Sequence, residues 1–151
     1  MGEYIRTVDA DLWVEQAGGK DMFHSVSVLP EDARSSIASI DGVTQVRPFV
    51  GRRFAATLNG DETILYVVGF SDRTGSPPVR IVSGTDDLER GEIILDRSIT
   101  KRNGIGIGNK VLVGSTEFKV AGISDGGNVI SLTYAFVRAD DAQKLSGLPG
   151  I

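Results

Sequence analysis

FAATLNGDETILYVVGF, residues 54–70, holds two strand-like runs on either side of Asn59-Gly60. An Asn-Gly pair between two such runs favours a two-residue hairpin turn, because both residues tolerate the positive φ angles that this turn requires. The second run, from Ile64 to Phe70, is the longest apolar run of the chain and is typical of a buried strand. The stretch therefore predicts a β-hairpin.

Apolar and alternating patterns before the hairpin predict further extended segments. Leu12-Trp13-Val14 indicates an apolar strand, in which we expect Trp13 to belong to the core. Phe23 to Leu29 alternates between apolar and polar residues and predicts a second extended segment, and Val43 to Val50 predicts a third.

One helix is predicted between these segments. Pro30-Glu31-Asp32 favours a helix start, because proline fits the first helical position and acidic residues suit the positive end of the helix dipole. Asp41-Gly42 indicates its end. Three residues at helical spacing form the expected buried stripe: Ala33, Ile37 and Ile40.

Strands dominate the chain after the hairpin. Residues 72–78 are rich in turn formers and predict a loop, and Ser124 to Asn128 predicts a flexible loop. Asp96 is a suitable N-cap for a short helix, and a last helix is expected from Asp140 to Leu145. The expected strands cover residues 79–82, 92–95, 110–113, 118–123 and 133–137. The element order predicts an α+β fold.

Composition and charge exclude several classes of protein. The chain has 151 residues, a net charge of −4 and no cysteine. No basic run exceeds two residues, so nucleic acid is not an expected partner. Without cysteine, disulfides and thiolate metal sites are excluded. No stretch approaches the ~18 apolar residues that cross a bilayer, and the N-terminus shows no signal-peptide pattern.

No pattern in the sequence indicates catalysis. His24 is the only histidine, and Gly69 to Arg73 lacks the second glycine of a nucleophile elbow. The glycines from Gly104 to Gly108 precede a strand, whereas a phosphate loop precedes a helix. The acid pairs Asp86-Asp87 and Asp140-Asp141 do not have the spacing of a calcium loop. We therefore expect no catalytic residue, no metal site and no cofactor.

An ordered series of motifs nevertheless resembles a known family. The motifs are ADLWV (10–14), FHSVSVLP (23–30), GVTQVRP (42–48), VVGF (67–70), GEIILD (91–96), GIGIGNKVLV (104–113), FKVAGI (118–123) and AFVRADDA (135–142). In this order they resemble the periplasmic core domain of MacB-type, FtsX-like ABC-transporter permeases. The resemblance extends from Ala10 to Leu145.

The resemblance implies an architecture of two lobes between the first and second transmembrane helices of a permease. One is a mixed-sheet, porter-like lobe with βαβ units, expected at about residues 10–70 and 126–147. The other is a smaller strand-rich lobe, inserted at about residues 71–125. The whole chain, 1–151, would then be one extracytoplasmic domain.

A mechanical function follows from the same resemblance. It implies a domain on the periplasmic or extracellular side of the membrane, driven by a cytoplasmic ATPase subunit through the membrane helices. A second permease copy and a periplasmic adaptor or accessory protein are the other expected partners. The exposed loops suggest five contact residues: Arg73, Thr74, Ser76, Asp125 and Asn128.

Two other functions remain open from the residues alone. One is a free-standing extracellular binding module, which would lack the flanking membrane spans of a permease. The other is an enzyme or its accessory barrel, which would need a cleft that gathers Asp96, Arg97 and His24.

Overall fold

The structure, a computed structural model, describes residues 10–18, 27–70, 80–126, 128–129 and 132–147. These residues form the α+β arrangement that the sequence predicts, with a mixed sheet. The helices are α2 (Ala33–Ala38), α3 (Arg97–Asn103) and α4 (Ala139–Ser146). The strands are β1 (Val50–Leu58), β2 (Asp61–Phe70), β3 (Arg80–Gly84), β4 (Glu92–Asp96), β5 (Lys110–Val113), β6 (Thr116–Asp125), β7 (Asn128–Val129) and β8 (Leu132–Arg138).

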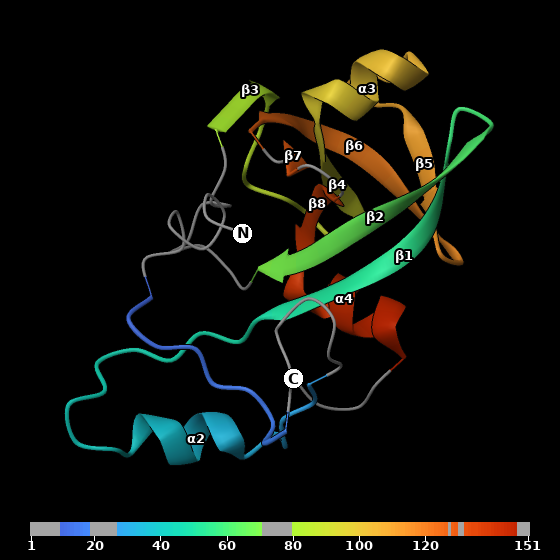
Figure 1. Cartoon of the computed structure of the whole chain (residues 1–151). Coiled ribbons are helices and arrows are strands. Elements are labelled where there is room, and N and C mark those ends of the chain that lie inside the picture. The colour runs from blue at the N-terminus through green and yellow to red at the C-terminus, as the bar shows by residue number, and fades with distance from the viewer. Residues whose placement is uncertain (1–9, 19–26, 71–79, 127, 130–131, 148–151) are drawn as a thin grey trace.

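The β1–β2 hairpin forms where the sequence predicts it. Asn59 has a φ of 52° and Gly60 a φ of 91°, so both central residues of the turn lie in the left-handed region. A turn of this kind matches the twist of the flanking strands. Leu58 faces Asp61 across the turn, and the pairing continues without a register shift along both strands. The hairpin is the long curved ribbon in Figure 1.

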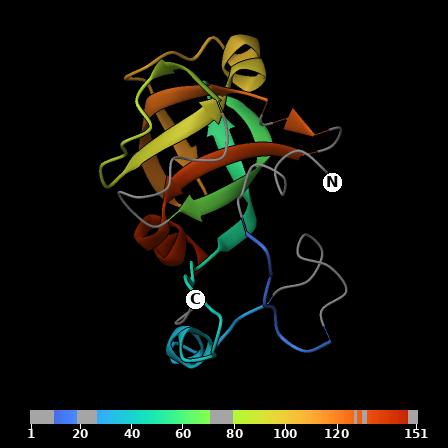
Figure 2. The ribbon, with the colours of Figure 1, turned by 90° about the vertical axis from the view of Figure 1, so that its left-hand side faces the viewer.

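The sheet closes on itself as a barrel. Its strand order is β2, β1, β5, β6, β4 and β8, and β8 pairs back with β2. The β2–β8 and β4–β6 pairings are parallel, whereas the other pairings around the ring are antiparallel. β3 and β7 lie outside the ring, on β6 and β8 respectively. Figure 2 shows the closed ring.

Both faces of the central barrel strands are buried. One hydrophobic cluster takes residues from all six ring strands and from α3 and α4, whereas a second takes the opposite face of β2, β4, β6 and β8. In β2, for example, Leu65 and Val67 belong to the first cluster, and Tyr66 and Val68 belong to the second. Burial on both faces explains why these strands are continuous apolar runs.

Local capping signals fix both helices of the barrel. The Asp96 carboxylate accepts a hydrogen bond from the Ser98 backbone N–H at 2.8 Å, which confirms Asp96 as the N-cap of α3. Gly104 ends α3 with a φ of 64°, and Gly147 ends α4 in the same conformation. The last predicted helix is therefore also confirmed.

The segment before the barrel differs from the prediction. No strand occurs in the described residues from 10 to 49, so the strands predicted at Leu12 to Val14 and over Val43 to Phe49 are wrong. Leu12 and Val14 are exposed. Of the extended segment predicted at Phe23 to Leu29, residues 23–26 lie outside the described residues, and 27–29 form no strand. A strand needs a neighbour to pair with, and no strand of the described part lies alongside these residues.

Helix α2 forms as predicted, but its buried stripe does not. Ala33 and Ile37 are only partly buried, and Ile40 is exposed. No residue of α2 is buried, because the helix lies apart from the barrel (Figures 1 and 2). The apolar spacing of this helix therefore gives no core.

Ser124 to Asn128 is not the flexible loop that the sequence predicts. Ser124 is fully buried in β6, where it pairs with Ile81 of β3 on one side and with Asp96 of β4 on the other. Asp125 ends β6, and Asn128 begins β7. The polar and glycine residues here are typical of a loop, but Ser124 belongs to a strand that pairs with a neighbour on each side.

The proposed division into two lobes stays a prediction. The sheet marks no boundary near residue 71 or 125, since β1, β2 and β8 share one ring with β4, β5 and β6. None of the described helices is long and apolar enough to cross a membrane.

Candidate partner-binding surface

The structure describes two of the five predicted contact residues. Arg73, Thr74 and Ser76 lie outside the described residues. Asp125 is the last residue of β6, and the backbone of Asn128 pairs with Thr133 in β8. Asp125 also contacts Arg80 at the start of β3 and Arg97 at the start of α3, so these elements meet at one end of the barrel.

The Asp125 carboxylate forms ion pairs with two arginines. Its Oδ2 accepts a hydrogen bond from Arg80 Nη2 at 2.7 Å, and its Oδ1 lies 3.0 Å from Arg97 Nη2. The hydrogen bond from Arg80 holds the pKa of Asp125 below its ordinary value; burial opposes this shift, and the charge of Arg97 reinforces it. Asp125 is thus ionised at neutral pH and acts as a bridge between β3 and α3.

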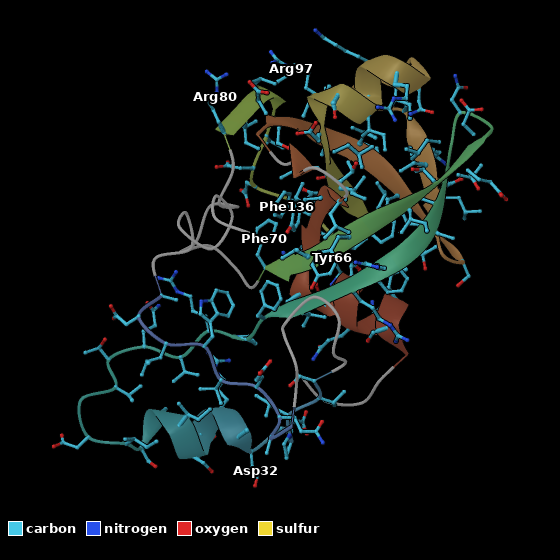
Figure 3. All side chains as sticks on the ribbon, in the orientation of Figure 1. Asp32, Tyr66, Phe70, Arg80, Arg97 and Phe136 are labelled. Carbon is cyan, nitrogen blue, oxygen red and sulfur yellow. The ribbon has the colours of Figure 1, made fainter. Side chains whose placement is uncertain are left out.

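The two arginines are more accessible than the acid that they share. The side chain of Asp125 is 27% exposed, whereas Arg80 is 73% and Arg97 is 47% exposed. Figure 3 shows both guanidinium groups at the outer end of the barrel. Two positive charges against one negative charge leave this cluster with an excess positive charge, available to an anionic group.

Sequence reasoning named Asp125 as a contact residue, but it missed Arg80 and considered Arg97 only as part of an enzyme cleft. Asp125 and Arg80 are 45 positions apart and meet only through the β3–β6 register, which contains an irregularity between Ile81 and Ser83. The sequence carries no signal for that register. For Arg97, the confirmed cap at Asp96 was an available signal, since it places Arg97 in the first turn of a helix that follows a buried strand.

A second charged cluster has a structural function. Asp140 accepts hydrogen bonds from Arg90 Nε at 3.0 Å and from Arg138 Nε at 3.1 Å. Burial disfavours its ionised form, but the two arginines outweigh burial and lower the pKa of Asp140. The buried Asp141 carboxylate accepts the Gly91 N–H at 2.9 Å. Together these bonds fasten the loop before β4 to the start of α4.

Trp13 is not the core residue that the sequence predicts. Its side chain is 38% exposed and meets Phe49 edge to face, with ring centroids 5.3 Å apart. This aromatic contact links the segment before α2 to the residue that precedes β1.

The described residues bring no metal-binding group together: no three His, Cys, Asp or Glu side chains gather there in a suitable arrangement. His24 lies outside the described residues. Asp96 is buried as the cap of α3, and Arg97 turns toward Asp125.

Two solved structures share this fold. The extracellular domain of the noncanonic ABC-type transporter YknZ from Gram-positive bacteria superposes with a TM-score of 0.62 at 17% identity, covering 82% of this chain and 69% of that one. The periplasmic region of MacB from Actinobacillus actinomycetemcomitans gives a TM-score of 0.61 at 12% identity, covering 82% of this chain and 61% of that one. No protein-family model and no curated protein matches the sequence.

The chain therefore has the fold of the external domains of ABC-type transporters, which confirms the resemblance at the level of the fold. It spans 61% of the MacB region, less than two thirds of that structure.

Proposed function

We propose that this chain is the extracytoplasmic domain of an ABC-transporter permease. In this proposal a cytoplasmic ATPase subunit moves the membrane helices, and the domain transmits that motion to a cargo or partner on the periplasmic or extracellular side. A second permease copy and a periplasmic adaptor or accessory protein are the further partners. The observation that carries the proposal is the shared fold over 82% of the chain with two transporter domains.

The packing of the barrel supports a mechanical function. A closed ring with both faces of its central strands buried resists deformation, because core packing tolerates little change of shape. The bonds from Asp140 and Asp141 fix α4 and the loop before β4 to the same body. A displacement applied through residues 10–49 would therefore move the barrel as one unit.

The contact surface of this domain is proposed at the end of the barrel that carries Asp125. Arg73, Thr74, Ser76 and Asn128 complete the contact region in this proposal. The exposed guanidinium groups of Arg80 and Arg97 support it, because arginine is enriched where proteins recognise charged partners.

Accessibility labelling in cells tests the location. The 151 residues contain no cysteine, so a single introduced cysteine reports one position. In the full-length gene product, Ile40→Cys places a thiol at an exposed site, and the matched Val67→Cys places one at a buried site. We expect a membrane-impermeant maleimide to label Ile40→Cys in intact cells or spheroplasts, Val67→Cys to label only after denaturation, and the unsubstituted protein to give the background.

The fractions that carry the label separate the alternatives. Labelling of Ile40→Cys in the membrane fraction, with co-purification of an ATPase subunit, is the expected result. Labelling only after cell lysis would refute an extracytoplasmic location. Labelled protein that is absent from the membrane fraction would contradict the permease and favour a free-standing extracellular binding module.

A further inference from the structure

Strand β3 has an edge that no strand of the described residues covers. It pairs with β6 on one side, and none of the other described strands pairs with it. The ring strands, by contrast, close on one another. An uncovered edge presents backbone N–H and C=O groups that can pair with another extended chain.

The side chains of β3 are also accessible. Ile81 is partly buried against the second hydrophobic cluster, whereas the other four residues of the strand are exposed. Val82, which is 40% exposed, falls at the irregularity in the β3–β6 pairing. Ile107 is another exposed apolar residue, and its side chain lies beside Gly84 at the far end of the strand. The edge therefore offers apolar contacts next to backbone groups that no described strand pairs.

Positive charge marks the start of the same strand. Arg80 is the first residue of β3, and Asp125 holds it beside Arg97. Lys101 follows Arg97 by one helical turn and is exposed as well. Helix α3 itself contains no acidic residue. A basic residue at a strand edge opposes pairing with a second copy of the same edge and selects a partner of opposite charge.

We propose that the outer edge of β3 binds an extended acidic segment of a partner protein as an added strand. Its backbone would pair with β3, its carboxylates would meet Arg80 and the positive charge that Arg97 adds beside it, and its apolar residues would meet Val82 and Ile107. The proposal that this partner is the extracytoplasmic partner of the domain rests on the proposed function. The ligand chemistry itself follows from the edge and its charge.

Peptide binding to the 151-residue chain tests the proposal without membranes. The probe is a blocked heptapeptide, Glu-Val-Glu-Val-Glu-Val-Glu, followed by amide NMR. We expect saturable shifts in β3 and slower hydrogen exchange of its amides. Lys-Val-Lys-Val-Lys-Val-Lys should not bind. Proline at the fourth position of the acidic peptide should abolish binding while keeping the charge, because proline cannot donate a ladder hydrogen bond.

Two double variants separate the local charge from the overall charge. Arg80→Ala with Arg97→Ala should weaken acidic-peptide binding by at least about tenfold, because charge-assisted hydrogen bonds are lost. Arg34→Ala with Arg47→Ala removes the same charge at exposed sites in residues 27–49 and should leave the affinity unchanged. The backbone amide spectrum shows whether each variant remains folded.

Three results would overturn the proposal. The first is that both double variants weaken binding equally, and the second is that the proline peptide binds as well as the acidic peptide. The third uses phosphatidylglycerol vesicles as a second probe: the chain binds the vesicles and does not bind the acidic peptide. Absence of all binding would also overturn it and would leave Arg80 as a residue that merely protects the edge. Because the peptide assay uses soluble chain, its failure is distinct from failure of the labelling experiment in cells.

Discussion

The barrel, residues 50–147, and the segment before it, residues 10–49, differ in how their apolar residues are used. Most apolar residues of the ring strands are buried, and two hydrophobic clusters share them. In the preceding segment Leu12, Val14 and Ile40 are exposed, and α2 has no buried residue. The contrast shows that an apolar pattern yields a core only where the segment packs against other elements of the fold.

The largest expected effect is a difference in stability between these two regions. Residues 10–49 lack a core of their own; Phe49 at their end packs against the second hydrophobic cluster of the barrel, and Trp13 meets Phe49. We expect this region to open at a cost far below the global free energy of unfolding. Trp13, the only tryptophan, reports on it by fluorescence, and far-UV circular dichroism reports on the barrel.

In a urea titration the fluorescence of Trp13 should therefore change before the dichroism does. Hydrogen exchange provides an independent check, since the amides of α2 should exchange much faster than those of β2 and β8. Coincident transitions by both probes would show that the two regions form one cooperative unit, and the comparison would then fail.

Truncation of a core residue gives the next largest effect. Phe136 in β8 is fully buried in the second cluster, so Phe136→Ala should lower the free energy of unfolding by about 3–5 kcal/mol. Ile40→Ala removes an exposed apolar side chain from the preceding segment and should change it by no more than about 0.5 kcal/mol. Urea unfolding followed by dichroism measures both, and similar losses for the two variants would contradict the contrast.

Close packing of α4 on β2 predicts an intermediate effect. A Cβ at Gly69 would lie 2.5 Å from Ala142 Cβ and 3.0 Å from Ala139 Cα, so Gly69→Ala should force α4 away from β2. Overpacking of this kind costs about 1–3 kcal/mol. A Cβ at Gly106 meets no atom closer than Asn109 Oδ1 at 3.9 Å, which makes Gly106→Ala the matched control.

The control should be neutral or slightly stabilising, by less than about 1 kcal/mol, because alanine reduces the freedom of the unfolded chain. Ala142→Gly by itself should cost about 1 kcal/mol as a glycine inside a helix, but it should cost less in the Gly69→Ala background, since there it removes the nearest clashing atom. Equal costs in the two backgrounds would place the cause outside the β2–α4 contact.

The predictable features of this fold are those with local signals. The Asn59-Gly60 turn, the Asp96 cap and the last helix each depend on a few neighbouring residues, and the structure confirms them. The β6 extension through Ser124 depends on two distant strands instead, and its polar and glycine residues are typical of a loop. The Arg80–Asp125–Arg97 cluster was hidden for the same reason, because pairing register is a property of the whole sheet.

The smallest effect comes from two aspartates that precede helices in the two regions. Asp96 caps α3 through a hydrogen bond to the Ser98 N–H, whereas Asp32 before α2 makes no side-chain capping bond. Asp96→Ala should therefore cost about 1 kcal/mol. Asp32→Ala removes the same charge and should cost no more than about 0.5 kcal/mol. Urea unfolding at neutral pH compares the variants, with Asp96→Asn as a variant that keeps a capping oxygen. Equal losses at both positions would mean that the charge of Asp96, and not its hydrogen bond to α3, stabilises this end of the barrel.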